Sequence, residues 1–298
     1  MQPPSARLPI RHDLSLAYAS SVAVALLMAV VSVVGIASSR LYDGGLQPGH
    51  PMVSRGGDGA NLLVGLPILL GALWLMRRGS IVGLLLWPGA LFYVSYTYGL
   101  YVVAAPLNAL FLPYVLLVTL SVYTLIAILA AINGDSVRKR LASLPARLLG
   151  GVLVVVGALA IAGLTWQVIG GLVGTTPTEP AIGTPAIAVD FIVGSAPLVI
   201  GGVLLWRRQS LGYVTAAGLL LVSAAGGVAF ALGGVVEGLL TGAVIDAWAI
   251  TIHLVIAAVA CAFLAVYVRG AARAAVDIGR TRSLSGARAG RRASKEAG

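Results

Sequence analysis

The chain has 298 residues, of which 59% are hydrophobic and only 10% are charged, and its mean hydropathy is +0.98. A soluble domain carries about 25% charged residues, so this composition excludes an ordinary soluble globular protein. Apolar runs of about 18 residues or more are typical of membrane-spanning helices. The formal net charge of +10 belongs to the flanks of these runs and therefore does not indicate nucleic-acid binding.

In chain order, the hydropathy pattern predicts eight helices, each near the ~20 residues that cross the hydrocarbon core of a bilayer. They are expected at about 14–38, 61–77, 80–102, 107–132, 147–172, 187–206, 210–232 and 243–268. The first run is longer than the roughly 7–15 apolar residues of a secretory signal, so we expect it to be retained. The predicted fold class is an all-α polytopic integral membrane protein with eight transmembrane helices.

The second and sixth predicted helices end in closely similar segments. Residues 67–80 read PILLGALWLMRRGS and residues 197–210 read PLVIGGVLLWRRQS, with six identities in fourteen positions. An alignment shifted by one residue pairs Asn61 with Asp190 upstream. Downstream it pairs two glycines with two others, namely Gly83 with Gly212 and Gly89 with Gly218. We interpret the similarity as a duplication, with convergence of two inward-ending helices as the alternative.

The duplication divides the chain into two membrane units of four helices each. The expected segments are a cytoplasmic N-terminus at 1–13, a first unit at 14–133, a basic linker at 134–146, a second unit at 147–268 and a tail at 269–298. An even number of spans per unit makes the two copies parallel, related by an axis along the membrane normal.

The distribution of basic residues predicts the orientation. With the N-terminus inside, cytoplasmic segments hold 18 of the 20 Lys and Arg residues, and only Arg40 and Arg55 lie outside. Both termini are therefore expected in the cytoplasm, and the Arg-rich, Ala-, Gly- and Val-rich composition favours the plasma membrane of a prokaryote. Acidic residues are expected to gather at the outer face: Asp43, Asp58, Glu179, Asp190, Glu237 and Asp246.

The last thirty residues hold eight basic residues and few apolar ones. This composition predicts a disordered tail. Such a tail is attracted to anionic lipid headgroups by about 1 kcal/mol for each basic residue near the surface. Anionic lipid is therefore a predicted partner, in addition to the bilayer itself.

The last predicted helix carries the first candidate site. Asp246 and His253 are seven residues apart, which places them on one helical face, with His253 near the bilayer midplane. An ionisable side chain at that depth is a functional-site hypothesis by default, because its burial in lipid is costly. The alternative is a neutral histidine that donates a hydrogen bond to a backbone carbonyl or a hydroxyl of a neighbouring helix.

Further candidates occur in the second, third and sixth helices. Asn61 and Asp190 are expected to begin the second and sixth helices and to face one outer vestibule, with N-capping as the alternative. In the third helix, Tyr93 and Tyr96 are predicted to line a polar cavity beside a kink at Pro88-Gly89, with interhelical packing as the alternative. Tyr98 and Tyr101 are expected in the interfacial aromatic belt.

No motif indicates a cofactor or a metal, and none indicates a catalytic site. The single cysteine, Cys261, excludes an intrachain disulfide and cysteine-rich metal sites. A non-enzymatic role is therefore favoured. The leading hypothesis is a transporter or permease for a small solute, an ion or a lipid-like molecule. The alternatives are a scaffold or accessory subunit of a membrane complex, and a membrane enzyme acting on a lipid or quinone. Assembly as a homo-oligomer stays open.

Overall fold

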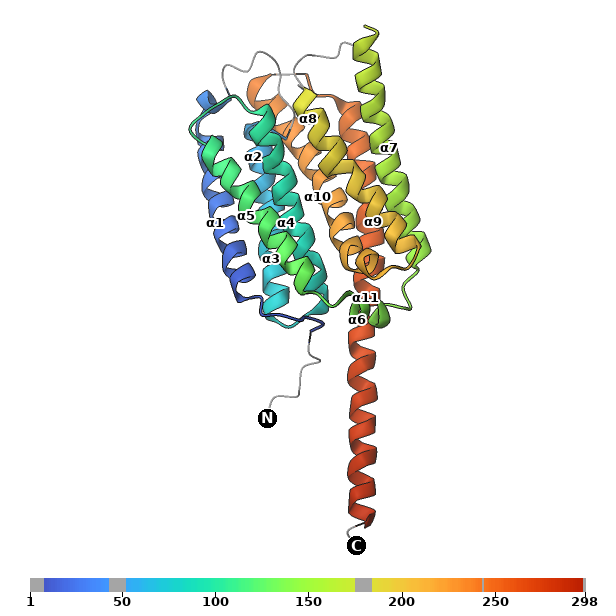
Figure 1. Cartoon of the computed structure of the whole chain (residues 1–298). Helices are drawn as coiled ribbons and strands as arrows, with labels where there is room; N and C mark the ends of the chain where they lie inside the picture. The colour runs from blue at the N-terminus through green and yellow to red at the C-terminus, as the bar shows by residue number, and fades with distance from the viewer. Residues whose placement is uncertain (1–7, 43–51, 175–183, 243, 297–298) are drawn as a thin grey trace.

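Two groups of helices stand side by side with their axes roughly parallel in the computed structural model of the chain (Figure 1). The structure describes residues 8–42, 52–174, 184–242 and 244–296, and within these ranges it is all-helical and contains no strand. Eight of its helical segments are long and apolar enough to cross a membrane, which confirms the predicted all-helical fold and the predicted number of candidate spans.

The helices follow one another in this order: α1 Ser15–Ala37, η1 Ser39–Leu41, α2 Arg55–Ala60, η2 Asn61–Gly65, α3 Leu66–Arg77, α4 Ile81–Ala104, α5 Phe111–Ala131, α6 Gly134–Arg140, α7 Ala146–Leu172, α8 Thr184–Val189, η3 Asp190–Ser195, α9 Ala196–Trp206, α10 Ser210–Thr241 and α11 Ala247–Glu296. The segments α2–η2–α3 and α8–η3–α9 each form one continuous span. We call the end of the bundle that holds α2 and α8 the upper end, and the opposite end the lower end, as drawn in Figure 1.

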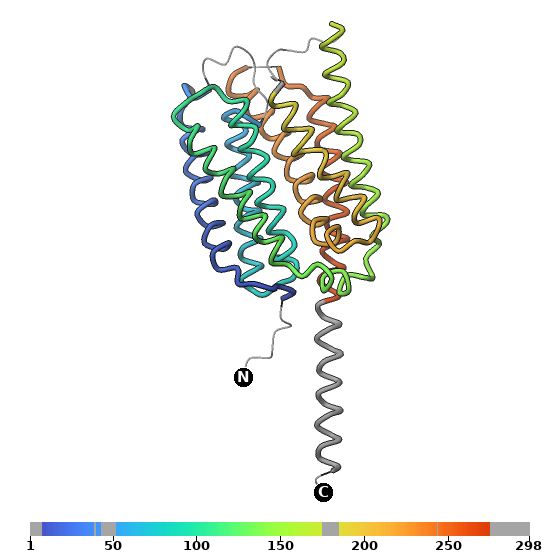
Figure 2. The backbone as a smooth tube through the Cα atoms, viewed as in Figure 1, coloured from blue at the N-terminus to red at the C-terminus, as the bar shows by residue number. Residues whose placement is uncertain are grey.

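The tube view shows that the chain passes from the first group to the second at the lower end, through the short helix α6 (Figure 2). α6 lies within the segment predicted as a linker, and Asn133 caps it by accepting a hydrogen bond from the backbone N–H of Ser136 at 3.1 Å. The helix α11 continues to Glu296, where a disordered tail was expected. Alanine and arginine, which are frequent there, are among the strongest helix formers.

The helices α4 and α10 form the centre of the bundle. In their most apolar windows, 78% of α4 and 56% of α10 is buried, against 39% or less in each other span. Gly89 of α4 and Gly218 of α10 lie directly against each other, since a Cβ atom built on Gly89 would lie 2.2 Å from the Cα of Gly218. The two groups therefore meet at a crossing of backbones that only glycine permits.

The second and sixth spans have the same internal construction. Each begins as an α-helix, passes through a π-helical segment and returns to an α-helix with a proline at its first or second position. The backbone N–H groups of Leu66 and Ala196 bond to the carbonyls five residues before them. Proline has no N–H to donate to the residue four positions earlier, so a wider turn beside Pro67 and Pro197 has a direct cause.

The turns that follow these two spans also agree at an offset of 129 residues. The N–H of Ser80 bonds to the Leu75 carbonyl at 3.1 Å, and the N–H of Gln209 bonds to the Leu204 carbonyl at 2.9 Å. Gly79 has a φ of 71° and the matching Arg208 has a φ of 56°; Arg208 is the single non-glycine residue with positive φ in the described chain. Arg208 thus adopts a left-handed backbone conformation that glycine adopts at the equivalent position, Gly79.

The two turns predict opposite effects of reciprocal substitutions. Replacing Arg208 by glycine should raise the free energy of unfolding by about 1 kcal/mol, because a left-handed conformation costs an L-residue about 1–2 kcal/mol. Replacing Gly79 by alanine should lower it by a similar amount. Thermal unfolding in detergent micelles measures both, and equal signs for the two variants would contradict the geometry of the turns.

Candidate functional site

A carboxyl group is buried at the upper end of the first group of helices. Asp58 lies in the first turn of α2, which begins where the Ser54 hydroxyl accepts a hydrogen bond from the N–H of Gly57 at 3.0 Å. The Asp58 side chain is fully buried. It accepts hydrogen bonds from the hydroxyls of Tyr42 and, at 3.2 Å, Tyr101. Its hydrogen bonds thus come from neutral hydroxyl donors, and no ion pair within the described ranges includes it.

Aromatic rings surround this carboxyl group. The rings of Tyr98, Tyr101 and Tyr114 lie against one another, with centroids 5.0–5.9 Å apart. The Tyr98 hydroxyl also bonds to that of Ser32 of α1 at 3.0 Å. Tyr98 and Tyr101 are completely buried, so their expected place in a lipid-facing aromatic belt is wrong. The two rings are buried because α4 packs against α1 and α5, and the position of a residue near the end of a helix does not reveal this packing.

Glycine makes the close approach of α1 to Asp58 possible. A Cβ atom on Gly35 would lie 1.8 Å from the Asp58 Oδ2 atom and 2.9 Å from the Tyr42 hydroxyl. Burial, followed by the neighbouring Asp58 carboxyl, raises the pKa of Tyr42 far above its ordinary value. Tyr42 therefore keeps its proton and remains a donor to Asp58.

Two charged groups flank the cluster without pairing with Asp58 in the described contacts. The Arg55 Nε–H donates to the carbonyl of Ile36 at 3.1 Å. The Glu237 carboxylate of α10 accepts a hydrogen bond from the N–H of Gly56 at 3.2 Å, so the second group of helices contacts the start of α2. A carboxylate at the start of a helix is favoured there because it faces unpaired N–H groups.

Asn61 and Asp190 lie inside their spans and do not begin them. α2 starts at Arg55 and α8 at Thr184, so both residues instead open the π-helical segments η2 and η3. The capping alternative is therefore wrong. The glycines that follow Arg55 resemble a loop in sequence, but the Ser54 cap starts the helix before them.

Asn61 and Asp190 each accept a hydrogen bond from a tyrosine of helix α4. The Tyr93 hydroxyl donates to Asn61 Oδ1 at 3.2 Å, and the Tyr96 hydroxyl donates to Asp190 Oδ1 at 2.6 Å. The second bond joins the two groups of helices. Four of the predicted site residues are thus brought together in pairs along α4, as interhelical hydrogen bonds.

Three buried polar atoms make no well-formed hydrogen bond to the protein's own atoms within the described part of the chain, although the hydroxyls of Thr97 and Tyr114 lie beside those of Tyr93 and Tyr42. They are Asn61 Nδ2, Thr97 Oγ1 and the hydroxyl of Tyr114. Asn61, Thr97 and Tyr114 are each only 1% exposed. Such groups are rare in native proteins, and they mark positions where ordered water or a ligand completes the hydrogen bonding.

His253 and Asp246 lie apart from these pairs, in α11 and at its start. The His253 ring stacks on Phe230 of α10 with centroids 3.7 Å apart, and its Nδ1 atom lies 2.8 Å from the carbonyl of Ala249. Asp246 is exposed and accepts a hydrogen bond from the N–H of Ala249 at 3.0 Å, which caps α11. These contacts match the packing alternative, except that the carbonyl partner belongs to the same helix.

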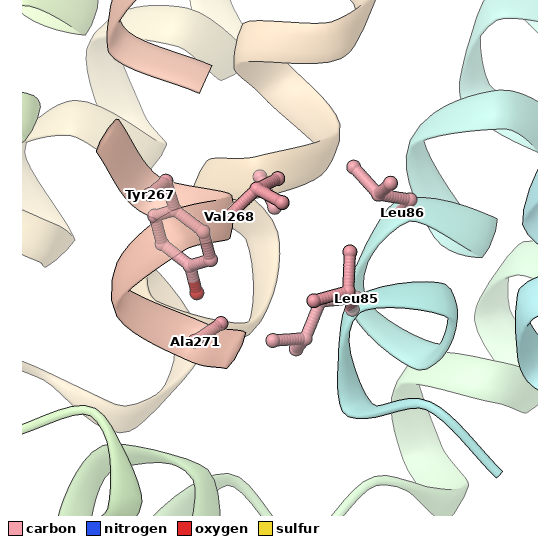
Figure 3. A pocket seen from close by; sticks show the side chains of 7 residues that line it. Leu85, Leu86, Tyr267, Val268 and Ala271 are labelled. Atoms are coloured by element: carbon pink, nitrogen blue, oxygen red, sulfur yellow. The ribbon is translucent and has the colours of Figure 1, made fainter. Parts of the chain in front are cut away.

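Between the two groups, the lower half of the bundle contains a narrow apolar crevice. Its wall consists of Leu85 and Leu86 of α4 and, opposite them, Tyr267, Val268 and Ala271 of α11 (Figure 3). The crevice is too narrow to hold a water molecule. It is closed to solutes in this conformation, and its lining offers them no polar atom besides the Tyr267 hydroxyl, which bonds to the backbone carbonyl of Tyr213.

Sequence reasoning missed the Asp58 cluster, although it had placed Asp58 at the outer face. One available signal was the spacing of Asp58 three residues before Asn61, which is typical of one helical face. It would have indicated that the second span begins before Asn61 and includes Asp58. Asp43 and Glu179 lie outside the described residues. Within the described ranges, no group of three or more His, Cys, Asp or Glu side chains is arranged to hold a metal ion.

Comparison with known proteins identifies no relative. No protein-family model, no curated protein and no solved structure matches this chain significantly. The function is therefore inferred from the geometry alone.

Proposed function

We propose that this protein is a membrane permease that couples the movement of a small solute to the binding of a proton at Asp58. One observation carries the proposal: a carboxyl group is completely buried in an apolar bundle and meets only hydroxyl donors among its hydrogen-bond partners. Ionising such a group is costly, so the neutral acid is favoured, and a change of conformation that admits water releases the proton.

The proposal includes a duplication of a four-helix unit. It is supported by the shared α–π–α construction of the second and sixth spans and by their matching turns. The contact of Gly89 with Gly218 adds support, because equivalent residues meet each other where an axis along the membrane normal relates two copies. A crossing of two glycines also has no side chains to interlock, so one unit can rock against the other.

The orientation and the lipid partner belong to the same proposal. The basic residues of the turns, of α6 and of the start of α7 lie at the lower end, which we assign to the cytoplasm. There the Arg78 guanidinium lies 3.7 Å from the ring centroid of Trp74, and that of Arg77 lies 4.5 Å from that of Tyr18. Such pairs are suited to anionic lipid headgroups at the interface.

Currents after a pH jump test the proposal without knowledge of the solute. The protein is reconstituted into vesicles of phosphatidylethanolamine and phosphatidylglycerol on a solid-supported membrane. Acidification should produce a transient current as protons bind within the membrane field. Asp58→Asn should lose at least about nine-tenths of the displaced charge, while the control Asp246→Asn keeps it, since asparagine also caps a helix. Equal currents from wild type and Asp58→Asn would overturn the proposal.

The second candidate is a scaffold or accessory subunit of a membrane complex. The narrow crevice of Figure 3 favours it, because no water-sized passage separates the two groups there. A scaffold predicts no pH-jump current from wild-type protein, and this result distinguishes the two candidates.

A further inference from the structure

The polar side chains around α4 lie on successive helical turns. Asp58 and Asn61 are three residues apart on one span, while Tyr93, Thr97 and Tyr101 follow one another at intervals of four on α4. Residues at these spacings are neighbours on a helix surface, with Cβ atoms about 5–6 Å apart. Because the Tyr101 hydroxyl bonds to Asp58 and the Tyr93 hydroxyl to Asn61, these five side chains, which we call the polar ring, lie together where the second span meets α4.

The ring extends to the second group of helices through Tyr96. This residue lies three positions after Tyr93 on α4, and its hydroxyl donates to Asp190 at 2.6 Å. Two carboxyl groups, Asp58 in the first group of helices and Asp190 in the second, thus each accept a hydrogen bond from a tyrosine of α4. The titratable groups near Asp58 are Tyr42, Tyr98, Tyr101, Tyr114 and Glu237, and those near Tyr96 are Tyr93 and Asp190.

Two members of the ring have unused hydrogen-bonding capacity. Asn61 Nδ2 carries two hydrogens and has no protein partner in the described chain, and Thr97 Oγ1, which lies beside the Tyr93 hydroxyl, can accept a further hydrogen bond. Both side chains are only 1% exposed. A buried donor without an acceptor is unfavourable in a membrane interior, so the site favours a neutral molecule that accepts a hydrogen bond from Asn61 Nδ2 and donates one to Thr97 Oγ1.

We propose that Asn61 and Thr97 hold a water molecule that completes a proton path from Asp58 to Asp190. The inference rests on the proposed function, and it adds a second proton-binding carboxyl group and the route between the two. Asn61 is a positioning residue, because its amide orients the water and does not change its own protonation. The hydroxyls of Thr97, Tyr93 and Tyr96 each accept one proton and release another. The Tyr93 hydroxyl, which donates to Asn61 at rest, turns toward Tyr96 for the transfer.

The transfer leaves no charge on the intermediate groups. The Asp58 carboxyl loses its proton to the water, which passes a different proton to the next hydroxyl. At the far end, Tyr96 gives its hydroxyl proton to the Asp190 carboxylate as it receives one from the chain. The net change is one proton moved from Asp58 to Asp190, and no electron is transferred.

Pre-steady-state currents from the full-length protein in the same vesicles test the path. After a pH jump, wild-type protein should show a fast component from Asp58 and a later one from Asp190. Thr97→Val should slow the later component at least about tenfold, a typical loss for one positioned proton-transfer group. Asp190→Asn should remove this component and leave the fast one. The matched control is Ser95→Ala on α4, because the Ser95 hydroxyl already bonds to the Phe92 carbonyl at 2.9 Å.

Infrared difference spectra of the same variants distinguish a defect in the proton path from a defect in folding. The carboxylic C=O band of Asp58 should persist in Thr97→Val and Asp190→Asn, since both leave the first proton site in place. A single component in wild type, or a later component that is unchanged in both variants, overturns the path but not the role of Asp58. Loss of the Asp58 band in both variants also overturns it, because the residues would then only support the fold. Absence of all current in wild-type protein removes both proposals.

Discussion

Replacing Gly89 by leucine is expected to separate the two groups of helices and to lower the free energy of unfolding by about 3 kcal/mol or more. A Cβ atom at this position would lie 2.2 Å from the Gly218 Cα and 2.8 Å from its carbonyl oxygen, and no flexible side chain is there to move away. Overpacking of an interior typically costs about 1–3 kcal/mol, and a clash of backbone against side chain lies at the upper end of this range. Thermal unfolding in detergent micelles measures the loss.

Gly71→Leu is the matched control for this substitution. Gly71 also lies within a helix, but nothing lies within 4 Å of a Cβ atom built on it. Leucine has the higher helix propensity, so stability should stay the same or rise by up to about 1 kcal/mol. Equal stability of Gly89→Leu and wild-type protein would contradict the contact between α4 and α10.

Replacing Asp58 by alanine is expected to lower the free energy of unfolding by about 2–5 kcal/mol. The substitution leaves the hydroxyls of Tyr42 and Tyr101 without their acceptor, and each unsatisfied buried donor costs about 1–3 kcal/mol. Asp58→Asn keeps an acceptor oxygen and should cost less than half as much. Chemical or thermal unfolding of both variants in the same detergent provides the comparison.

Asp135→Ala serves as the control for the loss of a carboxyl group. Asp135 lies on the surface helix α6, where it pairs with Arg138 at 3.6 Å and its side chain is 63% exposed. An exposed pair at this spacing contributes well under 1 kcal/mol. An Asp58→Ala variant as stable as Asp135→Ala would show that the tyrosine hydroxyls find other partners, and the hydrogen-bonded cluster would not stand.

The candidate site was only partly predictable, because a sequence reports the position of a residue along a helix but not the neighbour across the interface. Tyr93 and Asn61 were both predicted as polar site residues, yet nothing in the sequence pairs them. The spacing of Asp246 and His253 places them on one helical face, but it does not report what either side chain contacts. His253 faces Phe230, and Asp246 caps the start of the helix.

The sequence by itself determined the all-helical fold, the number of helices able to span a membrane and the similar construction of two of them. These follow from hydrophobicity, proline and glycine, whose effects are local or act through the bilayer as a uniform solvent. Only the tertiary structure decided that Asp58 is buried among tyrosines, that Tyr96 reaches Asp190 and that Gly89 meets Gly218. Each of these contacts joins residues far apart in the chain, and it depends on which helices become neighbours when the bundle packs.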